Sequence, residues 1–221
     1  MSLHCRVFQT TLFTLLLIPC ALARAVDLTS QAQAVLSAPD VSFSGTYDLP
    51  CRPAVLDSLL RHPILLGRLW TAYGFAPAYK VRAQGSGLHV EDPTGIVGEI
   101  VLAQQAGNRW VYLGDGMLNH RLVPSFRGKM ALVITTTPKG AGVGAHVDVF
   151  VRTESRALGL LAWTLFPLVK GRIESRVTLN ARDVGVILKD VSIAPQKIAS
   201  RLAGDDAAAF VRLFPPPGEK R

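Results

Sequence analysis

Residues 78–152 repeat one pattern, in which a short stretch rich in β-branched and aromatic residues is followed by a turn. The stretches are AYKVRAQ, LHVED, IVGEIVLAQ, RWVYLGDGMLNH, KMALVITTT and HVDVFVR. The turns hold glycine, proline and asparagine, which supply the tight or positive-φ positions that hairpins require. Because hairpins join antiparallel neighbours, the pattern predicts six strands of an antiparallel sheet. The glycine-rich segment 140–144 predicts a further hairpin, since no GKS or GKT follows it and a strand comes next.

In the segment before these strands, the spacing of the apolar residues changes along the chain. VSFSGTYDL (41–49) places Val41, Phe43 and Tyr47 on one side and small hydroxyl residues on the other, which predicts a first strand. From Pro53 the apolar residues recur at steps of three and four, which predicts two short helices broken at Pro63. Gly74 and Pro77 end the second of these helices.

The segment RALGLLAWTLFPLVKGR (156–172) contains thirteen consecutive uncharged residues, too few for a membrane-spanning helix. Pro167 interrupts it, which predicts one short helix over 155–166 and a second helix from residue 167. In the second helix an apolar stripe recurs at three- and four-residue steps: Val169, Ile173, Val177, Ala181, Val184, Leu188 and Val191. Such an amphipathic helix needs a partner surface, and we expect it to pack on the sheet. One or two short helices are expected after Pro195.

The predicted order is strand, two short helices, six strands and a long C-terminal helix. Over residues 41–192 this order resembles the helix-grip fold of steroidogenic-acute-regulatory-related lipid-transfer domains, birch-pollen-allergen-like proteins and polyketide cyclases. The resemblance lies in element order and length. It implies an α+β fold in which a curved antiparallel sheet of about seven strands wraps around the C-terminal helix and encloses an apolar cavity. The alternative is the half-open barrel of periplasmic lipoprotein carriers, which the two early helices fit less well.

The resemblance implies that the apolar stripe faces the cavity or the sheet and that the two short helices cap one end. Independently of it, aromatic side chains gather in the proposed cap and in the uncharged stretch. The expected ligand-binding residues are Trp70, Tyr73, Phe75, Tyr79, Trp163, Phe166, Ile173, Val177, Asn180 and Val184. Tyrosine and tryptophan combine apolar area with a polar group, which suits a pocket entrance. Core packing is the alternative for each aromatic residue. Asn180 would supply one orienting hydrogen bond, or would lie at the helix flank in water.

Three residues are candidates for acid–base chemistry. Glu99 lies in an otherwise apolar strand, so an inward orientation would raise its pKa and allow it to act as a base. An outward orientation would pair it with a cross-strand Arg or Lys instead. His89 and His146 are the other candidates. The histidines have no paired ligand spacing and no G-x-S-x-G motif is present, so we expect neither a metal, nor a cofactor, nor covalent catalysis.

Residues 1–25 have the order of a secretory signal peptide: Arg6, the apolar run TLFTLLLIP and the small-x-small site Ala23-Arg24-Ala25. A retained N-terminal anchor and lipidation at Cys20 are the alternatives, and Pro19 argues against lipidation. We expect export to the periplasm or outside the cell. Cleavage would leave Cys51 as the single cysteine, without an internal disulfide and expected to be a small buried apolar residue.

The full chain carries a net charge of +8, and the signal peptide holds two of its 24 basic residues and none of its 16 acidic ones, so the mature charge is +6. This charge favours an anionic membrane surface as a partner, although scattered charges also serve solubility. Nucleic acid is not expected, because the basic residues form no recognised module.

These observations predict a signal peptide (1–25), a leader or loose helix (26–40), a helix-grip-like domain (41–192) and a C-terminal short helix with a flexible tail (193–221). The leading hypothesis is an exported binding or carrier protein for a hydrophobic or amphipathic small molecule, such as a lipid. The alternatives are a cyclase- or hydrolase-like enzyme on the same scaffold, and an interaction module at the cell envelope. The absence of a catalytic motif favours binding over catalysis.

Overall fold

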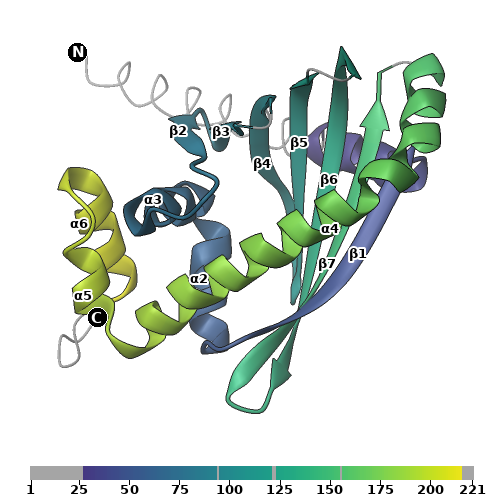
Figure 1. Cartoon of the computed structure of the whole chain (residues 1–221). Coiled ribbons are helices and arrows are strands. Elements are labelled where there is room, and N and C mark those ends of the chain that lie inside the picture. The colour runs from purple at the N-terminus through teal and green to yellow at the C-terminus, as the bar shows by residue number, and fades with distance from the viewer. Residues whose placement is uncertain (1–26, 94, 121–122, 155, 216–221) are drawn as a thin grey trace, which may run out of the picture.

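The computed structural model describes residues 27–93, 95–120, 123–154 and 156–215, with side chains outside 120–124 and 155–173. Within these ranges the chain forms a seven-stranded sheet and a set of helices (Figure 1). The strands are β1 (Val41–Leu49), β2 (Lys80–Gln84), β3 (Gly87–Glu91), β4 (Ile96–Ala106), β5 (Arg109–His120), β6 (Val123–Lys139) and β7 (Gly142–Thr153). The helices are α2 (Pro53–Arg61), α3 (Pro63–Tyr73), α4 (Arg156–Ile193), α5 (Pro195–Ala199) and α6 (Gly204–Leu213), and an N-terminal helix at residues 27–37 precedes them.

The sheet has the strand order β1-β7-β6-β5-β4-β3-β2, and every neighbouring pair is antiparallel. The first strand therefore lies beside the last one, and the hairpin strands follow in sequence. Helix α4 crosses one face of this sheet, with α2 and α3 at one end (Figure 1). This arrangement is the helix-grip fold, and the predicted α+β class and order of elements are confirmed.

The predicted hairpins form at glycines with a left-handed backbone. Gly85, Gly107 and Gly140 have φ values of 58°, 56° and 57° in the turns after β2, β4 and β6. Such values are strained for residues with a Cβ, so glycine sets these turns. The segment 140–144 is a hairpin, as predicted. Strand β6 begins at Val123, before its predicted start at Lys129.

Helices α2 and α3 each have proline in their first turn, where a missing N–H costs no hydrogen bond. The predicted break at Pro63 is confirmed. Helix α3 ends at Gly74, whose φ of 66° provides the left-handed cap that stops the helix.

The prediction of two helices separated at Pro167 is wrong, because α4 is one helix of 38 residues from Arg156 to Ile193. A proline inside a helix removes one backbone hydrogen bond but does not always end the helix. The helix therefore begins well before the apolar stripe from Val169 to Val191, from which a shorter helix was predicted.

The sheet has a buried apolar cluster on each face. On the face toward α4, which we call the concave face, Leu49, Trp110 and Tyr112 pack with α2, α3 and the second half of α4. On the opposite, convex face, Val111 and Val133 pack with the N-terminal helix. In Figure 1 that helix, in purple, lies behind the strands, and α4 lies in front of them. Residues 26–40, predicted as a leader or loose helix, thus contain a helix that is packed on the sheet.

The C-terminal helices α5 and α6 pack beside α3 at the end of the molecule away from the start of α4 (Figure 1). Ile198 of α5 and Phe210 of α6 are fully buried in the main core. Arg68 of α3 and Asp206 of α6 form an ion pair of 3.5 Å. The predicted helices after Pro195 are confirmed, and the end of the predicted flexible tail (216–221) lies outside the described residues.

Cys51, two residues after the end of β1, is buried in the main core, as predicted. Burial raises the pKa of its thiol to about 11. The thiol is therefore protonated near neutral pH and unsuited to act as a nucleophile.

Candidate functional site

The concave face of the sheet is apolar on every strand. Cross-strand register assigns the residues to this face, because directly paired residues in an antiparallel sheet point to the same side. In β1, β7, β6 and β5 they are Phe43, Tyr47, Leu49, Val143, Ala145, Val147, Val149, Phe126, Met130, Leu132, Ile134, Trp110, Tyr112 and Leu118. In β4, β3 and β2 they are Ile96, Ile100, Leu102, Leu88, Val90, Val81 and Ala83.

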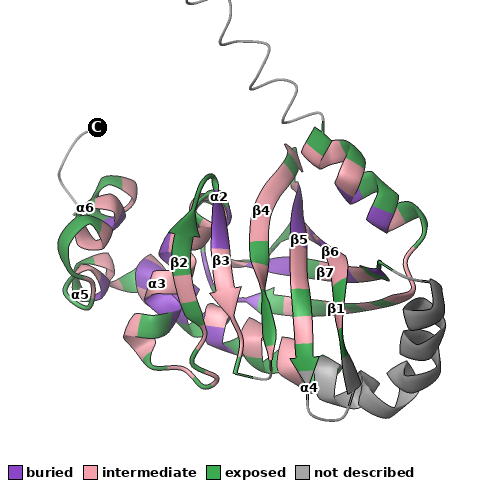
Figure 2. Ribbon diagram, turned by 90° about the horizontal axis from the view of Figure 1, so that it is seen from above, coloured by how far each residue is buried: buried purple, intermediate pink, exposed green. Residues whose placement is uncertain are grey.

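The two ends of the concave face differ in burial. At the end toward α2 and α3, Trp110, Tyr112 and Val143 are buried in the main core. At the opposite end Phe43 and Met130 are only half-buried, as are Phe126 and Leu118. Figure 2 shows this change along β5, which is buried at one end and exposed at the other. We call the half-buried end the concave groove.

A row of glycines crosses the concave face in β4, β5 and β6. Gly98 pairs with Gly116, and Gly116 pairs with Gly128. A Cβ at these positions would approach the carbonyl oxygens of Asp115, Val97 and Arg152 to 2.6, 2.8 and 2.9 Å. Since real Cβ atoms do not come so close to backbone, the row needs glycine, and it leaves this part of the groove without side chains.

The aromatic residues predicted around a pocket entrance form one cluster at the end of α3. The rings of Trp70 and Phe75 are 5.3 Å apart, those of Tyr73 and Phe75 are 5.2 Å apart, and those of Trp70 and Tyr79 are 5.4 Å apart. The indole of Trp70 donates a hydrogen bond to the carbonyl of Pro77 at 3.1 Å. Trp70 is buried, so it serves packing, while Tyr73, Phe75 and Tyr79 are less buried.

Tyr79 connects this cluster to α4 through polar contacts. Its hydroxyl accepts hydrogen bonds from Asn180 Nδ2 at 2.9 Å and from Arg176 Nε at 3.0 Å. Arg176 Nη2 lies 3.1 Å from Asp92 Oδ2, just after β3. Burial lowers the pKa of Arg176, but its contacts with Tyr79 and Asp92 outweigh this effect, so the pKa is raised and the guanidinium stays charged. We call these four residues the polar cluster.

The remaining predicted ligand residues lie on α4. Val184 packs against the main core, and Val177, which directly follows Arg176 in the sequence, is half-buried. The side chains of Trp163, Phe166 and Ile173 lie outside the described residues.

The three candidate acid–base residues lie on the convex face, away from the groove. Glu99 pairs with His89 and Asp115 in register and accepts a hydrogen bond from Gln84. His89 is mostly buried, and its Nε2 lies 3.6 Å from Glu91 Oε1. His146 lies beside Thr46 and Asp148, with its Nδ1 3.0 Å from the Thr46 hydroxyl. None of the three faces α4.

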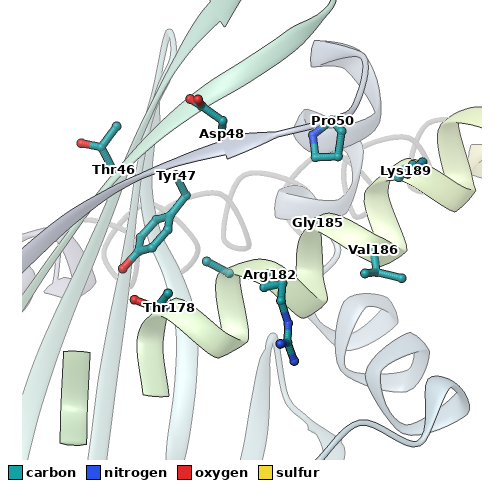
Figure 3. Close-up of a pocket in the computed structure, with 10 residues that line it drawn as sticks. Thr46, Tyr47, Asp48, Pro50, Thr178, Arg182, Gly185, Val186 and Lys189 are labelled. Carbon is teal, nitrogen blue, oxygen red and sulfur yellow. The ribbon is translucent and has the colours of Figure 1, made fainter. Parts of the chain in front are cut away.

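A second feature is an open cleft of about 460 Å³ between the end of β1 and α4. Its walls are Thr46, Tyr47, Asp48 and Pro50 on one side and Thr178, Ala181, Arg182, Gly185, Val186 and Lys189 on the other. Figure 3 shows Tyr47 extending from β1 toward Thr178. This cleft was not predicted from the sequence. Its helix residues include Ala181 of the apolar stripe and neighbours of that stripe, and a Cβ added at Gly185 would lie 3.7 Å from Pro50 Cδ, in ordinary van der Waals contact.

In the part of the chain that the structure describes, no three His, Cys, Asp or Glu side chains are grouped closely enough to hold a metal ion. Among the described helices none combines the length and apolarity needed to cross a membrane.

No known protein family's sequence profile matches the chain, and no curated protein sequence matches it significantly. Among solved structures, Ara h 8.0201 is similar with a TM-score of 0.46 and 12% identity, covering 67% of this chain and 97% of that one. An uncharacterized protein from Rhizobium leguminosarum has a TM-score of 0.44 and 11% identity, with coverages of 67% and 94%. The di-domain ARO/CYC BexL from the BE-7585A biosynthetic pathway has a TM-score of 0.40 and 15% identity, with coverages of 79% and 60%.

The order of strands and helices, together with the apolar concave face, defines the class of this protein. It has the helix-grip fold, in which one long helix crosses an antiparallel sheet.

Proposed function

We propose that the protein is an exported binding or carrier protein for a hydrophobic or amphipathic small molecule, such as a lipid. The supporting observation is the concave groove, where Phe43, Met130 and Phe126 are apolar but only half-buried. Partly exposed apolar surface is costly, at about 25 cal/mol per Å². A ligand that fills the groove would remove this cost.

The polar cluster would receive the polar end of an amphipathic ligand. Arg176 and Asp92 are paired, so their charges offset each other, and Tyr79 and Asn180 offer neutral hydrogen-bonding groups. A few polar groups at one side of an apolar site fix the orientation of a ligand. This arrangement favours a hydroxyl, carbonyl or amide group over a strongly charged one.

The positions of the three candidate acid–base residues favour binding over catalysis. Glu99, His89 and His146 lie on the convex face, so none can contact a ligand in the concave groove. A general acid or base must come within hydrogen-bond reach of the reacting group.

Export is part of the proposal and is supported by the sequence of residues 1–25. The periplasm or the extracellular space is the proposed compartment. Secretion is compatible with Cys51 as the one cysteine of the mature chain, because its burial protects the thiol.

Native mass spectrometry tests this proposal on the full chain expressed in its own host and purified without detergent. The mass after denaturation reports whether residues 1–25 have been removed. We expect a mature chain with an additional mass that is lost on denaturation and recovered in an organic extract. A folded mature protein that carries no ligand, and takes up none when lipid extract is added, would contradict the carrier proposal.

A further inference from the structure

The outer side of α4 carries an exposed apolar line. Leu179, Val186 and Ile193 are 43%, 40% and 71% exposed. They are spaced by seven residues, close to two helical turns, so they lie on one side of the helix over about 21 Å. We call them the outer stripe. Their exposure is unusual beside Ile187, Leu188 and Val191, which the same helix buries completely.

Basic side chains border the outer stripe on one flank. Arg182 and Lys189 each follow a stripe residue by three positions, and both are exposed. On the other flank, Asp183 is buried and pairs with Arg182 at 3.1 Å, and Asp190 accepts a hydrogen bond from Tyr73 at 2.9 Å. The pair with Asp183 offsets the charge of Arg182, so the positive charge of the exposed border comes mainly from Lys189.

We propose that the outer stripe and its basic border dock the protein onto an anionic membrane surface. An exposed apolar line flanked by Lys and Arg matches the boundary between lipid acyl chains and anionic head groups. The mature charge of +6 adds a long-range attraction to the same surface. Docking would bring the β1–α4 cleft to the lipid surface, because Val186, Arg182 and Lys189 belong to both features.

This proposal goes beyond ligand binding and does not depend on it. If the protein also binds a lipid, docking would let that ligand enter from the bilayer through the cleft. This consequence alone rests on the proposed function. The test therefore includes one measurement for each property.

The test is co-sedimentation of the mature protein, residues 26–221, with vesicles of phosphatidylcholine alone or mixed equally with phosphatidylglycerol. The variant L179S/I193S removes two stripe residues. The control V97S/M117S removes two side chains that are 37% and 43% exposed on the convex face, away from α4. Circular dichroism and thermal unfolding check that both variants are folded.

We expect the wild type to bind phosphatidylglycerol vesicles and to lose binding as salt is raised, since salt screens exposed charges. L179S/I193S should bind on the order of tenfold more weakly, while V97S/M117S should bind like the wild type. K189Q should weaken binding less than L179S/I193S. The binding of Nile red, an uncharged apolar dye, should remain unchanged in L179S/I193S, which separates docking from the groove.

Three results would overturn the proposal. The first is a wild type that does not sediment with vesicles, or does so irrespective of phosphatidylglycerol. The second is an equal loss in V97S/M117S, which would show that the outer stripe is not the contact. The third is a concentration-dependent dimer that L179S/I193S abolishes, which would assign the stripe to a second copy of the chain.

Discussion

Both faces of the sheet carry apolar residues, but these residues are covered to different degrees. On the convex face the N-terminal helix covers an apolar patch, so Val111, Ala131 and Val133 are almost fully buried. On the concave face α4 packs chiefly against β1, and the groove residues Phe43 and Met130 stay half-buried. The concave face therefore keeps apolar surface that its neighbours cover only in part, while the convex patch is covered almost completely.

The strands themselves reflect this difference. In β5, Trp110, Val111, Tyr112 and Leu113 are all buried, so no alternation is visible in that half of the strand. Further along β5, Asp115 lies on the convex face and Gly116 on the concave face, and the alternation returns. The sequence of a strand is continuously apolar only where both faces of the strand are covered.

The largest effect is expected from a charge placed under the N-terminal helix, which tests whether this helix seals the convex patch. Val35 is 1% exposed and packs with Val111 and Val133, so V35D would bury an unpaired carboxylate or undock the helix. We expect the free energy of unfolding to fall by about 3 kcal/mol. Chemical denaturation measures this change. Q33D, at an exposed position of the same helix, should stay within about 0.5 kcal/mol of the wild type.

If V35D is as stable as the wild type, the N-terminal helix does not contribute to the fold. The contrast between a sealed and an open face would then be lost.

A smaller difference in stability is expected between substitutions on the two faces of one strand. Val133 and Met130 both belong to β6 and point to opposite sides. V133A should cost about 2 kcal/mol, because it leaves a cavity under the N-terminal helix. M130A should cost less than about 1 kcal/mol, because its side chain already contacts water. Urea unfolding of both variants measures the difference, and equal losses would mean that the groove is ordinary core.

Much of the fold follows from sequence patterns. The turn glycines Gly85, Gly107 and Gly140 separate the strands, and Pro53 and Pro63 begin the early helices, so the order of elements is readable. The predicted break at Pro167 failed because one missing backbone hydrogen bond does not outweigh the packing of a long helix.

The docking of the N-terminal helix was not predictable to the same degree. Leu28, Ala32, Val35 and Leu36 have helical spacing, but the stretch is short and largely polar. It packs only because β5 and β6 present an apolar convex patch, which depends on strand register. A helix this short gains its stability from tertiary contacts.

The candidate site was predictable in part. The facing of Glu99, His89 and His146 depends on register, because a shift of one residue moves a side chain to the other face. The link between Tyr79 and Asn180 joins residues far apart in sequence, and only the crossing of α4 over the sheet brings them together. The β1–α4 cleft was missed for the same reason.

The central claim is that the concave groove binds apolar ligands, and a matched pair of substitutions tests it most directly. Met130 lies in the groove, and Met117 is exposed on the convex face of the neighbouring strand. Fluorescence titration with Nile red compares M130E and M117E with the wild type. We predict that M130E lowers dye affinity by about tenfold or more and that M117E leaves it unchanged. Equal effects of the two substitutions, or no effect of M130E in a folded protein, would contradict a ligand site in the groove.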